Sequence, residues 1–177
     1  MRGYRNAPVA CCIVNKELNF KTILSLQADG LLFCIYEKRG EAMKEVLSVG
    51  MIGGGQMGEA LIRGMIESEL LPPANITVAE PMGRRREYLE DTYNVKGVES
   101  PAELVGNSQT LILSIKPQIM EPVLRQYSTY LTEKHLLISI AAGIPLACME
   151  NFVGENHRII RVMPNTPALV LAGASAM

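Results

Sequence analysis

The sequence predicts an α/β domain built on a doubly wound, mostly parallel sheet with helices on both faces. Three features of the chain support this fold class. Short apolar runs recur from residue 46 onward, segments with helical spacing separate them, and polar or glycine-rich residues follow each run. Strand–helix–strand repetition of this kind indicates βαβ units joined by right-handed crossovers.

Five apolar runs are expected to form the strands. They are apolar at nearly every position instead of every second one, which is typical of parallel strands covered on both faces. Because the carboxyl ends of parallel strands meet at one edge, the polar residues after each run are expected to gather there, where open α/β folds bind ligands. The five runs are residues 49–52, 76–79, 110–115, 136–140 and 159–162.

The segments between the strands are expected to be helices. In the first of them, apolar and small residues recur at a spacing that places them on one face, and Glu59 lies elsewhere on the helix. Pro72 and Pro73 stop this helix, because proline lacks the backbone N–H that a helix needs. The expected helices are residues 56–69, 84–93, 101–106, 121–130 and 145–152.

Residues 1–42 differ from the rest in their residue pattern, and their apolar residues show no clear helical or strand period. We expect an N-terminal extension of uncertain structure here, followed by a dinucleotide-binding domain over residues 43–177. Two alternatives stay open for the extension: it has little fixed structure, or part of it forms a hairpin that turns at Asp29-Gly30.

Charge and composition argue against several classes of function. Seventeen basic and eighteen acidic residues give a net charge of −1, so electrostatics offers no reason to expect a nucleic-acid partner. The four cysteines and two histidines lack the spacing of metal ligands, so no metal site is expected. The chain shows neither a membrane span nor a signal peptide, which predicts a cytoplasmic protein with reduced thiols and no membrane partner.

The glycines Gly53, Gly55 and Gly58 fit the pattern G-x-G-x-x-G between the first expected strand and the first expected helix. In that setting the first glycine allows a tight turn, and the second lets the backbone approach a pyrophosphate. The third allows close contact between helix and strand. The unpaired N–H groups at the start of the helix favour an anion. The motif therefore predicts a Rossmann-like dinucleotide site.

The end of the second expected strand leaves the choice of dinucleotide open. Glu80 lies where an acidic residue binds the adenosine ribose hydroxyls of NAD. Arg84, Arg85 and Arg86 follow at once, and nearby arginines suit the 2′-phosphate of NADP. At least one of these arginines is expected to be simply solvated in the first turn of a helix.

Several motifs, taken in order, resemble one family. The segments "VGMIGGGQMGEALIRGMI", "ILSIKPQ", "LLISIAAGIPL" and "RVMPNTPALVLAGASAM" are similar to the N-terminal domain of pyrroline-5-carboxylate reductase, over about residues 46–177. The resemblance implies a Rossmann-like domain that uses NADP or NAD. It also implies hydride transfer to the C=N bond of 1-pyrroline-5-carboxylate, which gives L-proline in the last step of proline synthesis.

The resemblance also implies which residues form the site. It assigns no catalytic residue. Family members often have asparagine where this chain reads Glu99-Ser100-Pro101, so that contact is not carried over. Asn165 and Thr166 resemble a loop beside the nicotinamide and the substrate. The cofactor contacts fall on Ile52, Gly53, Gly54, Gly55, Gln56, Met57, Gly58, Glu80, Ser114, Ile115, Lys116, Pro117, Ile140, Ala141 and Ala142.

The chain departs from the family at both ends. Family members continue into further strands and an all-helical domain that makes the dimer, whereas this sequence ends at Met177. We therefore expect a fold that is incomplete at its C-terminal end, and a homo-oligomer only where the helical domain is present. Two alternatives to a working reductase stay open: an inactive dinucleotide-binding fragment, and another Rossmann reductase of the β-hydroxyacid dehydrogenase type.

Overall fold

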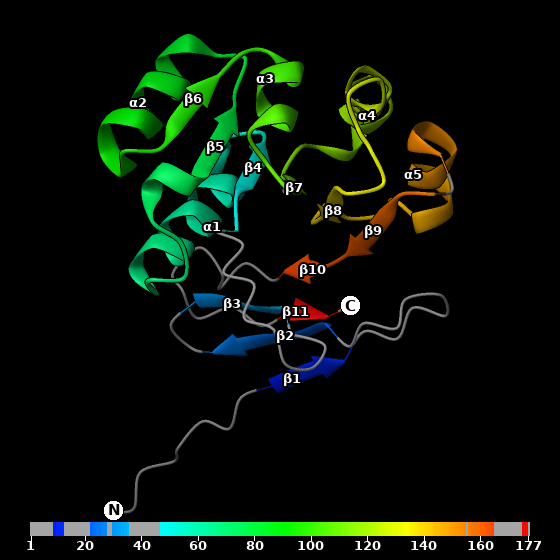
Figure 1. Ribbon diagram of the computed structural model, residues 1–177, viewed down its shortest axis with the longest axis horizontal. Helices are drawn as coiled ribbons and strands as arrows, with labels where there is room; N and C mark the ends of the chain where they lie inside the picture. The colour runs from blue at the N-terminus through cyan, green and yellow to red at the C-terminus, as the bar shows by residue number, and fades with distance from the viewer. Residues whose placement is uncertain are drawn as a thin grey trace, which may run out of the picture.

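The centre of the molecule is a six-stranded sheet in which every neighbouring pair of strands is parallel (Figure 1). The computed structural model describes residues 9–12, 22–27, 30–35, 47–154, 156–164 and 175–176. The strands run in the order β6-β5-β4-β7-β8-β9. Their bounds are β4 Val49–Ile52, β5 Ile76–Ala79, β6 Lys96–Val98, β7 Thr110–Leu113, β8 Leu136–Ser139 and β9 Arg158–Arg161.

This strand order confirms the doubly wound fold. The chain enters at β4 in the middle of the sheet, moves outward to β6, returns to the other side of β4 as β7, and then moves outward to β9. The direction of winding reverses between β4 and β7, which are paired from Val49 opposite Thr110 to Ile52 opposite Leu113. In doubly wound sheets the crevice for a ligand opens at the carboxyl ends of the two strands at such a reversal.

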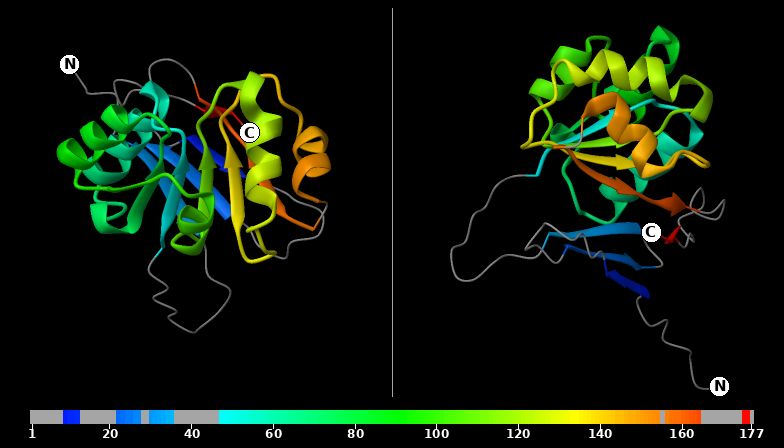
Figure 2. Two further views of the ribbon diagram at one scale, coloured as in Figure 1. Left: turned by 90° about the horizontal axis from the view of Figure 1, so that it is seen from above. Right: turned by 90° about the vertical axis from the view of Figure 1, so that its right-hand side faces the viewer.

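Helices cover both faces of the sheet, as Figure 2 shows. Because the winding reverses, α1 and α2 pack on one face and α3, α4 and α5 on the other. Within the described ranges, no helix has the length and apolarity needed to cross a bilayer. The helices are α1 Gln56–Glu67, α2 Gly83–Tyr93, α3 Pro101–Gly106, α4 Met120–Ser128 and α5 Leu146–Val153, with 3-10 turns at Pro73–Asn75 and Pro117–Ile119.

Two separate apolar cores explain why the strands are apolar at nearly every position. Successive side chains on a strand point to opposite faces. Met51 packs in the core beneath α1 and α2, whereas its neighbour Ile52 packs in the core beneath α3, α4 and α5. Ile112 and Leu113 of β7 divide between the two cores in the same way.

One strand of the sheet, β6, was missing from the expected elements. Its residues are Lys96, Gly97 and Val98, and only Val98 is buried. Among the described strands it pairs only with β5, at the edge of the sheet. An edge strand of this length needs no apolar run, and the sequence therefore carried no signal for it.

The first helix ends two residues before its expected end. Ser68 caps α1, and Glu69 adopts a left-handed φ of 55°. The N–H groups of Leu70 and Leu71 then donate to the carbonyl of Met65 at 3.1 and 3.3 Å. The chain has thus left the helix before it reaches the two prolines at 72 and 73.

The N-terminal segment contains a three-stranded antiparallel sheet in the order β1-β2-β3, with β1 Val9–Cys12, β2 Thr22–Gln27 and β3 Gly30–Ile35. Strands β2 and β3 form a hairpin, which was one of the two expectations, but Gly30 pairs with Gln27 as the first residue of β3 and is not part of the turn where it was expected. The connecting residues 28–29 lie outside the described residues. Near the other end, β10 Met163–Pro164 pairs with β11 Ser175–Ala176. The division of the chain at residue 42 stays a prediction.

Candidate functional site

The loop between β4 and α1 lies at the carboxyl edge of the sheet, wedged between the ends of β5 and β7. Gly53 has a φ of +95°, and its N–H donates to the carbonyl of Ala79 at 2.9 Å. A Cβ on Gly53 would lie 2.5 Å from the carbonyl oxygen of Ser114 and 2.8 Å from Ile115 Cγ2. Only glycine suits this position, because both the positive φ and the close approach exclude a side chain.

Gly55 is the N-cap of α1 and borders open space: apart from its own neighbours in the chain, no described residue has a heavy atom within 4 Å of where its Cβ would stand. The first hydrogen bond of the helix runs from Glu59 N–H to Gly55 O at 2.8 Å, and no side chain caps the helix. The N–H groups of Gln56 and Met57 therefore have no acceptor within the helix. Such an end attracts an anion, by about 0.3–1 kcal/mol when exposed and up to about 2 kcal/mol when partly buried.

Gly58 has the opposite surroundings. A Cβ there would lie 2.5 Å from the carbonyl oxygen of Gly53 and 3.2 Å from Ser114 Oγ. The absence of a side chain lets the first turn of α1 lie directly on the loop that precedes it. The helix end is thereby fixed close to the carboxyl ends of β4 and β7.

Glu80, the residue after β5, is buried with 9% of its surface exposed. Its Oε2 accepts a hydrogen bond from Gly54 N–H at 2.9 Å, and its Oε1 accepts one from Met82 N–H at 3.1 Å. The carboxylate thus ties the glycine loop to the segment that leads into α2. It stands at the position expected for a ribose ligand, but both of its oxygens already have partners within the fold.

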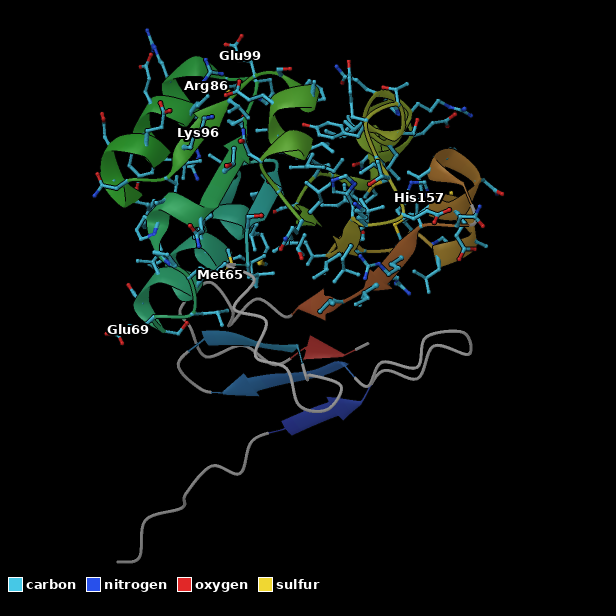
Figure 3. The ribbon with its side chains drawn as sticks, viewed as in Figure 1. Met65, Glu69, Arg86, Lys96, Glu99 and His157 are labelled. Carbon is cyan, nitrogen blue, oxygen red and sulfur yellow. The ribbon has the colours of Figure 1, made fainter. Side chains whose placement is uncertain are left out.

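The three arginines at the start of α2 have three different environments. Arg85 donates from Nε to Gly54 O at 2.6 Å and from Nη2 to Glu59 Oε2 at 2.5 Å. Arg86 donates from Nη1 to Glu80 O at 2.8 Å and pairs with Glu99 Oε1 at 2.5 Å, a pair visible in Figure 3. Arg84 is exposed and makes no hydrogen bond or ion pair with the residues that the structure describes.

Glu59 joins α1 to α2 through several partners. Besides Arg85, its carboxylate accepts hydrogen bonds from Tyr88 Oη at 3.0 Å and Tyr93 Oη at 2.8 Å. Burial acts to raise the pKa of Glu59, but the hydrogen bonds from Arg85, Tyr93 and Tyr88 outweigh it and the pKa lies below its ordinary value. Burial and the hydrogen bond to this carboxylate raise the pKa of Tyr93 to about 12.

This cluster was not expected from the sequence, which had suggested only that Glu59 lies off the apolar face of its helix. A signal was present on the other helix. Arg85 and Tyr88 are three residues apart and so share a face of α2, and Arg85 lies 5.0 Å from the centre of the Tyr88 ring. Such a face of one cation and one hydroxyl suits a carboxylate on a neighbouring helix.

The next two strands place further predicted residues along the same edge. Ser114 N–H donates to Ile52 O at 2.9 Å, which draws the end of β7 beside the glycine loop. Lys116 is exposed and directly precedes the 3-10 turn that begins at Pro117. At the end of β8, Ile140 N–H donates to Leu113 O at 3.2 Å.

The small residues after β8 continue this edge. Ala141 N–H donates to Ser139 Oγ at 3.3 Å, and Ala142 is exposed. Fifteen of the predicted site residues, all those from Ile52 to Ala142, thus lie at or next to the carboxyl ends of β4, β5, β7 and β8. Asn165 and Thr166 lie outside the described residues. Within the described part of the chain, no three His, Cys, Asp or Glu side chains gather into a metal-binding group.

Comparison with known proteins gives a family match over the same region. Residues 48–143 match the family described as "NADP oxidoreductase coenzyme F420-dependent". A pyrroline-5-carboxylate reductase of Synechocystis is 40% identical over 131 residues, which cover 74% of this chain and 48% of that protein. The chain spans about half the length of the curated relatives it matches.

Solved structures agree with this match. A pyrroline-5-carboxylate reductase from Coxiella burnetii superposes with a TM-score of 0.70 at 28% identity, over 74% of this chain and 48% of that one. The pyrroline carboxylate reductase of Plasmodium falciparum, solved with NADP bound, gives a TM-score of 0.65 at 30% identity, over 76% and 48%. The resemblance to the N-terminal domain of these reductases, predicted from the motifs, is confirmed.

Proposed function

The chain belongs to the family described as "NADP oxidoreductase coenzyme F420-dependent", and we propose that it forms the cofactor-binding part of a pyrroline-5-carboxylate reductase. In this proposal it binds NADPH or NADH at the carboxyl edge of the sheet. The substrate is 1-pyrroline-5-carboxylate and the product is L-proline. A cytoplasmic location stays a prediction.

The observation that carries the proposal is the uncapped start of α1 beside open space at Gly55. A pyrophosphate needs backbone N–H groups that point at it and room to approach them. The N–H groups of Gln56 and Met57 supply the donors, and the missing side chain of Gly55 supplies the room. The first turn of α1 thus suits the diphosphate that joins the two halves of NAD(P)H.

The remaining contacts follow from the same edge. Ser114 and Ile115 flank the glycine loop on the side of β7, and Ala141 and Ala142 follow β8 one strand further on. Small residues there leave room for a flat ring to lie against the sheet edge. When bound, the dihydronicotinamide supplies the hydride that reduces a C=N carbon.

The role of this chain in such a reaction is mainly alignment. The reduction adds a hydride to the carbon and a proton to the nitrogen of the imine, so a substrate that arrives as an iminium ion needs no proton from the protein. Holding the reactants at near-attack distance is then the main contribution to rate. We propose Asn165 and Thr166 as substrate contacts on the family resemblance alone, and assign no catalytic residue.

The test uses the purified chain. NADPH and NADH are titrated against it by fluorescence, and 1-pyrroline-5-carboxylate is then added while the absorbance of the reduced cofactor is followed. Binding followed by oxidation of the cofactor is expected for a reductase. Binding without oxidation favours the second candidate, a dinucleotide-binding unit without turnover. If neither cofactor binds, the proposed function is wrong.

A further inference from the structure

A cavity of about 540 Å³ lies at the amino edge of the sheet, opposite the edge that carries the glycine loop. Ser48, Gln109 and His135 line it, and each directly precedes a strand: β4, β7 and β8 in turn. Because these strands are parallel, their amino ends meet at one edge. Cavities of about 300–1,000 Å³ are the size that binds small molecules. The amino-edge cavity is thus large enough for a ligand and separate from the predicted cofactor site.

The charge of the cavity favours an anion. Its described lining includes Lys134 and no aspartate or glutamate. Lys134 is exposed, and its ammonium makes no ion pair with any residue that the structure describes. Glu133 precedes it in the chain but does not line the cavity, and Glu103 of the adjoining helix α3 pairs with Lys96 instead, at 2.8 Å. The positive charge of Lys134 is therefore available to a ligand.

His135 adds a hydrogen-bond donor whose position is defined by its tautomer. Its Nδ1 lies 2.9 Å from Thr132 N and 3.0 Å from Thr132 Oγ1. A backbone N–H can only donate, so Nδ1 is the acceptor and the neutral ring carries its proton on Nε2. That Nε2–H has no partner among the described residues. Lys134 and His135 thus bring two donors to one cavity, the number that the two oxygens of a carboxylate accept.

Ser108 is a second, independent sign of a polar ligand. Only 4% of its surface is exposed, and its Oγ has no hydrogen-bond partner in the described part of the chain. Gly50 leaves the room for this hydroxyl, since a Cβ there would stand 2.6 Å from Oγ. Buried polar groups in native proteins are nearly always hydrogen-bonded. The lining of the cavity therefore holds a polar group whose partner the described residues do not supply.

The rest of the lining is mixed in polarity. Ala102 and Val105 of α3 give it an apolar side, Gln109 carries an amide, and Tyr130 offers a ring with a hydroxyl. A phosphate dianion is usually met by arginine or by several charged donors, whereas a single lysine balances a single negative charge. The lining thus suits an acid with one carboxylate and an apolar part.

We propose that the amino-edge cavity is a second ligand site, which binds a small organic monocarboxylate. The carboxylate is held by Lys134 and His135, and the apolar part of the ligand packs against Ala102 and Val105. This site takes no part in the proposed function, because it lies at the opposite ends of the strands from the glycine loop.

The experiment titrates the ¹⁵N-labelled chain with benzoate and follows its amide signals by NMR. The signals of Ser48, Gln109 and His135 are expected to shift, with a dissociation constant of about 1–10 mM, the range of a ligand this small. Benzamide has the same shape without the charge. It is expected to bind at least about fivefold more weakly, because it forms no charge-assisted hydrogen bond.

Two variants test the two donors. Lys134→Gln removes the charge and is expected to weaken benzoate roughly 5- to 10-fold, with little effect on benzamide. His135→Asn keeps an acceptor for Thr132 N–H but lacks the Nε2–H, and is also expected to weaken benzoate several-fold. Lys116→Gln is the matched control, since it removes a lysine charge before the 3-10 turn at the other edge of the sheet. It is expected to leave the affinity for benzoate unchanged.

The same spectra show whether each variant is folded, so loss of binding is distinguished from loss of structure. Equal affinities for benzoate and benzamide overturn the proposal, as does a benzoate affinity that neither Lys134→Gln nor His135→Asn changes. Shifts confined to the residues of the glycine loop would place the anion at the other edge and also overturn it, as would the absence of any shift. No nicotinamide cofactor enters the titration, so none of these failures bears on the proposed function.

Discussion

Gly55 and Gly58 belong to one motif but face opposite surroundings, so the same substitution at each is expected to have different effects. Beyond its own chain neighbours, a methyl group on Gly55 meets no heavy atom of the described residues within 4 Å, whereas one on Gly58 lies 2.5 Å from a backbone oxygen. Gly55 leaves room for a ligand, and Gly58 leaves room for the neighbouring backbone of the chain itself. The two variants therefore separate binding from folding at the residue scale.

Gly55→Ala is expected to weaken NADPH binding while the stability of the chain stays close to that of the wild type. The methyl occupies the space that a pyrophosphate needs, and a loss of about 1.4 kcal/mol would raise the dissociation constant about tenfold. Fluorescence titration measures the affinity, and urea unfolding measures the stability. An unchanged dissociation constant would show that the pyrophosphate does not lie against Gly55.

Gly58→Ala is expected to destabilise the fold by about 1–3 kcal/mol, the usual cost of overpacking. The carbonyl of Gly53 that the methyl meets is backbone, and Gly53 is itself fixed by its hydrogen bond to Ala79. Urea unfolding at neutral pH gives the change directly. Stability equal to that of the wild type would mean that the first turn of α1 moves away from the loop at little cost.

Residue spacing predicted the glycine loop because its three glycines are close in sequence and act on the local backbone. The Glu59–Arg85 pair joins residues 26 positions apart and depends on how α1 and α2 pack. Helical periodicity tells which face of a helix is polar, but not which partner that face meets. The same limit applied to Glu80, whose position was predicted while its bonds to Gly54 and Met82 were not.

At the scale of elements, Glu59 joins α1 to α2, two helices that pack on the same face of the sheet. Because its side chain is charged, the stability that this junction contributes should fall at acid pH. The pKa of Glu59 is lowered in the folded chain, because its hydrogen bonds outweigh the effect of burial. A lowered pKa means that the carboxylate stabilises the fold above its ordinary value of 4.5, and that this contribution is lost as the pH falls through the folded value.

Glu59→Gln is therefore expected to be destabilised by about 1 kcal/mol at pH 7, an amount typical of a charge-assisted hydrogen bond after discount for partial exposure. The difference from the wild type should shrink as the pH falls below 4.5, because the unfolded carboxyl becomes protonated before the folded one. Urea unfolding across this range measures it. A constant difference at every pH would mean that the charge of Glu59 is not what joins α1 to α2.

Elements with a strong local pattern were predicted well, and those fixed by position in the sheet were not. Strands β4 and β5 have the bounds that their apolar runs predicted, because both lie in the interior with all four residues buried. Strand β6 lies at the edge and has one buried residue, so its three residues gave no pattern. Its place depends on pairing with β5, which is a property of the sheet and not of the segment.

At the scale of the whole molecule, the candidate site exists only because the sheet is assembled. The glycine loop follows β4, Glu80 follows β5 and Ser114 follows β7. These three strands are adjacent in the sheet but far apart in sequence, and Ser114 N–H donates to Ile52 O at their carboxyl ends. The fold class was predictable from the order of strands and helices, and so was the shared edge that carries the candidate site residues. Which side chains of the candidate site come close to one another could not be predicted, because it depends on how the helices pack on both faces of the sheet.

A ligand that binds across these strands should stabilise the entire domain, because it binds the folded chain and not the unfolded one. At a free NADPH concentration 100 times its dissociation constant, linkage adds about 2.7 kcal/mol, which corresponds to a rise in Tm of roughly 5–10 °C for a chain of this size. Differential scanning fluorimetry with increasing NADPH measures the shift. Gly55→Ala is the matched control, since its fold is expected to persist while its Tm rises only at higher NADPH concentrations. A wild-type Tm that does not respond to NADPH would mean that the site assembled at β4, β5 and β7 does not bind this cofactor.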